Sequence, residues 1–199
     1  MVTHEADSAG LKGVVWLVAI LNLAYFGIEF AVARAIQSVS LFADSIDFLE
    51  DASVNFLILV ALGWSRARRA RVGMALAGIL LVPGIAALWT AWQKFLTPIP
   101  PAPMPLSLAG AGAFAVNLSC AFMLTRYRKH AGSMARAAFL SARNDVLANV
   151  AIVGAGLITA YIWSAWPDLI VGLGIALMNA GAAKEVYVAA REEHRRALP

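Results

Sequence analysis

The chain has 199 residues, of which 61% are apolar and 14% are charged. An ordinary soluble domain has roughly 45 to 50% apolar and about 25% charged residues, so this composition indicates a membrane protein. The net charge of +4 does not indicate a nucleic-acid partner, because the basic residues lie at the ends of apolar runs and not on one polar face.

Six apolar runs, bounded by charged residues or prolines, predict six transmembrane helices. They cover approximately residues 12–34, 39–63, 72–96, 105–125, 135–162 and 166–188. The predicted fold is therefore all-α, a bundle of six transmembrane helices over residues 12–188. Residues 1–11 and 189–199 are expected to be short tails, which leaves no room for a second globular domain.

The basic residues predict the orientation, because Lys and Arg accumulate in short cytoplasmic loops. Thirteen of the 16 fall in the N-terminal tail, between spans two and three, between spans four and five, or late in the chain. Arg34 and Lys94 lie on the opposite side, and Arg143 falls within a span. We therefore expect both termini to be cytoplasmic and the proline-rich segment 97–105 to be a non-helical exterior loop.

Acidic residues inside predicted spans are the main functional signal, since a carboxylate at bilayer depth costs at least about 2.5 kcal/mol and normally marks an ion or proton path. In the second span, Asp44, Asp47, Asp51 and Asn55 fall within about 80° of one another around a helix. Asp44 stands near the exterior end, where ligation and a gating or capping role are both open. Glu50 points away from this stripe.

The fifth span carries a matching stripe in which Ser141, Asp145 and Asn149 are spaced by four residues. The pattern predicts two facing helices, each with oxygen atoms one turn apart, which is a spacing that can share one ion. Asn144 is a further candidate oxygen donor, about 60° from Ser141 around the helix. In the first span, Asn22 and Glu29 share one face, either to line a polar interior or to bond neighbouring helices.

Three carboxylates with a hydroxyl or amide oxygen form a hard, anionic site that suits a divalent cation. Without a cation, ionised acids in a low dielectric repel one another and tend to take up protons. Alternation between these two states is the simplest basis for proton-coupled antiport. A purely structural role, in which the acids pair with Arg143, is disfavoured because one base cannot satisfy five acids.

The stretch from Asn22 to Asn55 resembles the first two spans of the cation diffusion facilitator family. The residues that carry the resemblance are Asn22, Glu29, the run Ser40-Leu41-Phe42-Ala43-Asp44-Ser45 and the pair Asp47-x-x-x-Asp51. Ser141 and Asp145 fall at the family's second ligand pair, and Asp168 resembles the acid that opens its sixth span. The resemblance implies a homodimer in the cell membrane that exports divalent metal ions in exchange for protons, with Asp47, Asp51 and Asp145 as metal ligands. It implies no enzymatic activity and no catalytic cofactor.

Two departures from the family pattern affect these expectations. Ser141 stands where the family commonly has histidine, and a site without imidazole favours manganese, iron(II) or cobalt relative to zinc. The family's usual C-terminal cytoplasmic domain is not expected in a chain that ends at Pro199.

Two other functions remain open from the residues. One is a passive cation channel or a non-transporting metal-binding scaffold. The other is a membrane phosphotransferase of the CDP-alcohol type, whose aspartate pattern begins like Asp44-x-x-Asp47 but continues with residues that this chain lacks.

Overall fold

A computed structural model describes residues 2–61, 85–125 and 132–178. Within these ranges all regular structure is helical, with α1 over Val2–Ile36, α2 over Val39–Ala61, α4 over Pro103–Thr125 and α5 over Gly132–Ile162. Two further helical stretches cover residues 85–96 and 166–178, so that the described ranges contain six helical segments. The expected all-α architecture is confirmed.

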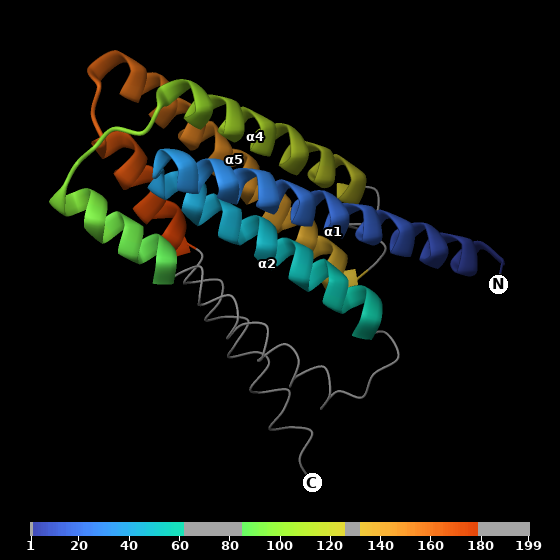
Figure 1. The fold of residues 1–199 in the computed structure, drawn as a ribbon. Coiled ribbons are helices and arrows are strands. Elements are labelled where there is room, and N and C mark those ends of the chain that lie inside the picture. Colours follow the sequence, from blue (N-terminus) through green and yellow to red (C-terminus); the bar gives the residue numbers. More distant parts are fainter. Residues whose placement is uncertain (1, 62–84, 126–131, 179–199) are drawn as a thin grey trace, which may run out of the picture.

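Figure 1 shows α1, α2, α4 and α5 running side by side as a bundle, with α1 and α2 in front of α5. The most extensive helix contacts join α4 to α5 and α1 to α2, while α1 also packs on α4 and α2 on α5. The α1–α2 turn and the connections at residues 97–102 and 163–165 lie at the end of the bundle opposite the N-terminus (Figure 1). We call this end the turn end.

Several helices have the character of membrane spans. Lys12–Ile36, Pro103–Thr125 and Asn144–Ile162 are long and apolar enough to cross a bilayer, and Trp166–Met178 is a shorter apolar helix. The outer surface is rich in exposed apolar side chains, among them Leu23, Ile28, Leu108, Phe122, Leu157 and Leu177. α2 also has the length of a span, but four acidic residues interrupt its apolar character.

The turn between α1 and α2 is tight. Gln37 adopts a left-handed conformation with φ of 52°, and the Ser38 N–H donates to the Ala33 carbonyl over 3.0 Å, which closes α1 with a Schellman-type cap. The Ser38 hydroxyl then accepts from the Leu41 N–H over 3.2 Å and caps the start of α2. The two helices are therefore antiparallel neighbours that share one buried interface.

α1 begins at Val2 and continues through the expected N-terminal tail, while its membrane-span part, Lys12–Ile36, begins where the first span was predicted to begin. One predicted boundary was wrong. α4 begins at Pro103, so the end of the expected proline loop is helical. Pro103 and Pro105 lie in the first turn, where backbone N–H groups have no partner within the helix and proline is tolerated.

Candidate functional site

The acidic stripe of α2 faces the inside of the bundle. Asp44 is completely buried, while Asp47 and Asp51 are partly buried. The stripe therefore runs from the buried half of α2 near the turn end toward its less buried half. Glu50 is also partly buried, although the helical pattern points it away from the stripe.

Asp145 lies on α5, the helix that was expected to face α2. Its carboxylate interacts electrostatically with Asp51, Asp44 and Glu50, all of which belong to α2. Since α2 and α5 are also in direct contact, Asp145 lies across a helix interface from the acidic stripe of α2.

The remaining predicted oxygen donors of α5 differ in their placement. Asn144 is exposed to the surroundings of the bundle. Ser141 belongs to α5, but its side chain lies outside what the structure describes. Within the described ranges, no three side chains of the histidine, cysteine, aspartate or glutamate type form a group that could hold a metal ion.

A buried polar chain joins three helices beside these acids. The Asn149 amide on α5 donates to the Asp44 carboxylate over 2.5 Å. The Asn117 amide on α4 donates to the Asn149 carbonyl oxygen over 3.0 Å. Asp44 thus lies in the bundle interior and takes no part in capping α2, and Asn117 forms the interhelical hydrogen bond expected of buried asparagines.

Asn55 has a different role from the other members of the stripe. Its amide donates to the backbone carbonyl of Asp51 over 2.7 Å, so the side chain folds back on its own helix. The side-chain oxygen of Asn55 has no hydrogen-bond partner among the residues described.

α1 contributes two further polar side chains to the interior. Asn22 and Glu29 are completely buried, and their side-chain oxygen and nitrogen atoms lack hydrogen-bond partners in the described part of the chain. Glu29 interacts electrostatically with Asp44 and Asp47. The acidic side chain of Glu29 on α1 therefore lies beside the acidic stripe of α2.

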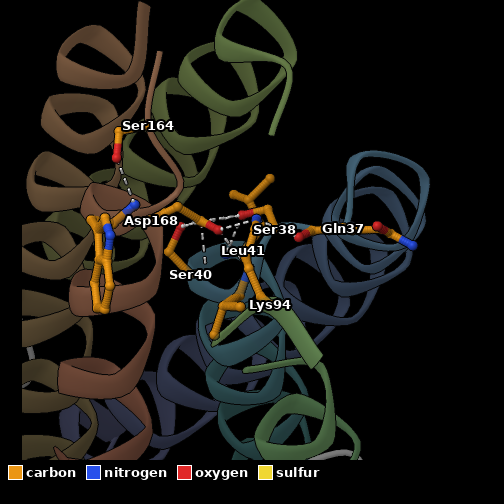
Figure 2. Close-up of polar contacts among 9 residues, drawn as sticks. Gln37, Ser38, Ser40, Leu41, Lys94, Ser164 and Asp168 are labelled. Atoms are coloured by element: carbon orange, nitrogen blue, oxygen red, sulfur yellow. Dashed lines mark hydrogen bonds and ion pairs between the residues drawn. The ribbon is translucent and has the colours of Figure 1, made fainter. Parts of the chain in front are cut away.

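A second polar cluster occupies the turn end (Figure 2). Asp168 is completely buried there, and its carboxylate accepts from the hydroxyls of Ser38 and Ser40, each over 2.6 Å. It also accepts from the backbone N–H groups of Val39 and Ser40 over 2.9 and 3.1 Å. A carboxylate at the first turn of α2 is favourable because the unpaired N–H groups there carry partial positive charge.

Lys94 completes this cluster from the helix at residues 85–96. Its ammonium group donates to Asp168 over 2.8 Å and to the Gln37 carbonyl over 2.6 Å. Both charged side chains are almost fully buried. We refer to Asp168, Lys94, Ser38 and Ser40 as the turn-end cluster.

Sequence reasoning singled out Asp168, Lys94 and Ser40 of the turn-end cluster but not their association. Asp168 stood out as the acid opening the sixth span, and Lys94 as a rare base on the exterior side. A base near one span end and an acid near another were the available signals. Nothing local in the sequence pairs residues that are 74 positions apart.

Comparison with known families identifies the chain. The family model described as the cation efflux transmembrane domain matches residues 15–191, which covers nearly all of the helical region. A comparison with curated proteins gave no match. The family match confirms the resemblance drawn from the spans, and with the apolar helices it indicates a metal-cation transporter in a membrane. The chain belongs to the cation efflux family.

Proposed function

We propose that this protein exports a divalent metal ion from the cytoplasm in exchange for protons, by alternating access to a carboxylate site between α2 and α5. The supporting observation is that Asp145 on α5 interacts electrostatically with Asp51 on α2 at the contact between the two helices. Carboxylates on two packed helices can enclose one ion from two sides.

The proposed ligands are Asp47, Asp51 and Asp145, with the Ser141 hydroxyl as the fourth oxygen donor. Binding of the ion would draw these groups together, because its two positive charges offset the repulsion between the carboxylates. Without imidazole the site loses affinity for zinc relative to harder ions, so manganese, iron(II) and cobalt are candidate substrates beside zinc. The metal is the transported substrate.

Proton exchange follows from the same charges. When the ion leaves, closely spaced carboxylates in a low-dielectric interior are stabilised by taking up protons, and a new ion must displace these protons. Buried Glu29 and Asp44 extend this acidic path toward the turn end. The proposed cycle takes place in the cell membrane, in a homodimer whose termini face the cytoplasm.

Transport by reconstituted protein tests the proposal. Proteoliposomes should accumulate manganese, iron(II), cobalt, zinc or cadmium, with a luminal pH change that follows metal flux. Asp51→Asn and Asp145→Asn should each reduce flux strongly, while Asp7→Asn near the N-terminus serves as a matched control and should leave flux unchanged. Metal flux without proton movement would instead indicate a channel, and unchanged flux in both site variants would refute the assigned site.

A further inference from the structure

The turn-end cluster connects three segments that must separate if the bundle opens at that end. Ser38 and Ser40 belong to the start of α2, Lys94 to the helix at residues 85–96, and Asp168 to the helix at residues 166–178. Figure 2 shows Asp168 at the centre of these contacts. One carboxylate therefore holds the start of α2 against two other helices.

Close backbone packing surrounds this contact. A Cβ atom built on Gly172, one turn after Asp168, would lie 2.6 Å from the Ser40 nitrogen and 2.6 Å from the Val39 carbonyl carbon. The last described helix thus approaches the backbone of α2 directly, which leaves no space for a path between them at this level. Small residues permit such approaches in membrane helices.

A hollow of about 620 Å³ leads to the cluster from the surface. Its lining includes the exposed side chains of Arg34, Gln93 and Thr97 and the buried side chains of Phe42 and Lys94. Lys94 therefore both lines this hollow and contacts Asp168.

The chemistry of the cluster suits reversible separation. It consists of an ion pair and hydrogen bonds from hydroxyl and backbone N–H groups, each of which water can replace once the segments move apart. α2 also carries Asp44, Asp47 and Asp51, so a displacement of its first turn would be transmitted along a rigid helix to the acidic stripe.

We propose that the turn-end cluster is the closing contact of the exterior end of the transport path, formed in this structure and broken when that end opens. The inference rests on the proposed alternating access. Lys94 and Asp168 are positioning residues in it, since they act on the path through α2 and do not bind the ion.

Accessibility of a thiol deeper on α2 tests the inference. Ser45 is buried and lies about 7.5 Å along the helix axis beyond Ser40. With the single native cysteine removed by Cys120→Ala, a Ser45→Cys reporter can be labelled by a membrane-impermeant maleimide added to right-side-out vesicles. Inside-out vesicles provide the control for sidedness.

The variant that carries Cys120→Ala and Ser45→Cys is the parent for this test. Labelling of the reporter should be slow in the parent, and also after the further change Lys94→Arg, which keeps the charge. Labelling should be at least about tenfold faster when Lys94→Met and Asp168→Asn are combined, because loss of the contact shifts the equilibrium from the closed toward the open exterior end. The double variant leaves no buried charge unpaired, so it is expected to fold. Gln93→Met, beside Lys94 on the lining of the hollow, should label as slowly as the parent. Parent-like labelling of the double variant, or fast labelling of Lys94→Arg, would overturn the proposal.

A second measurement distinguishes a gate from a purely structural contact. A metal gradient that drives turnover should increase reporter labelling in the parent, and Asp51→Asn should remove this increase. A rate that does not respond to turnover would overturn the gating role. If the parent carried no metal flux at all, the proposed function would fail, while the effect of the double variant on labelling could still be measured separately.

Discussion

Asn149 donates its amide to the Asp44 carboxylate across the α2–α5 interface, with both side chains completely buried. Asn149→Ala removes this donor and also the acceptor for Asn117. Leaving buried polar groups unsatisfied costs about 1 to 3 kcal/mol, so the variant should unfold at clearly lower temperature in detergent. Ser119→Ala, which alters an exposed hydroxyl bonded within α4, is the control. Equal unfolding temperatures for both variants would contradict this reading.

Tyr25 ties α1 to α4, because its hydroxyl donates to the Ala109 carbonyl over 2.6 Å. Tyr25→Phe retains the ring and loses only this hydrogen bond, so we expect a loss of about 0.5 to 1.5 kcal/mol in unfolding free energy. Tyr161→Phe changes a side chain that is 92% exposed and should have no measurable effect. Denaturant unfolding of both variants in the same detergent checks the difference.

Gly172 and Gly174 provide a matched pair on one helix. An alanine Cβ at position 172 would meet the backbone of α2, whereas nothing lies within 4 Å of one at position 174. Gly172→Ala should therefore force the helices apart and destabilise the protein by about 1 to 3 kcal/mol. Gly174→Ala should be neutral or stabilising by a few tenths of a kcal/mol, since alanine favours helix. If both changes destabilised the protein equally, the close contact with α2 would not be the reason why position 172 needs glycine.

The sequence predicted the local features of the fold well because they depend on short-range patterns. The end of α5 at Ile162 and the start of α2 at Val39 follow from span boundaries, and the helical spacing of the acids placed Asp44, Asp47 and Asp51 on one stripe. The interaction between Asp145 and Asp51 follows from the matching stripe on the fifth span.

The features that sequence reasoning missed depend on long-range contacts. Asp168 binds the first turn of α2 across 128 to 130 residues of chain, and no local pattern encodes that partner. Asp44 was left between a ligand, a gate and a cap, because its hydrogen bond with Asn149 depends on how α2 and α5 pack. The early start of α1 was missed because a helix can continue beyond its apolar run.

Ser141→His tests what sets metal selectivity. Imidazole is a stronger ligand for zinc than a hydroxyl, so the variant should raise the ratio of zinc to manganese transport in proteoliposomes. Ser141→Ala, which removes the hydroxyl without adding a ligand, should lower flux of both metals without this change in ratio. An unaltered ratio in Ser141→His would argue against Ser141 as a ligand.

The central claim is that Asp51 and Asp145 act on the same transported ion. A double-mutant cycle of initial metal flux measures this most directly, with Asp51→Asn, Asp145→Asn and the combined variant compared at equal protein in proteoliposomes. Residues that act as one unit lose function together, so the combined variant should lose little more than either single variant. Losses that multiply, as they would at two independent sites, would contradict the account.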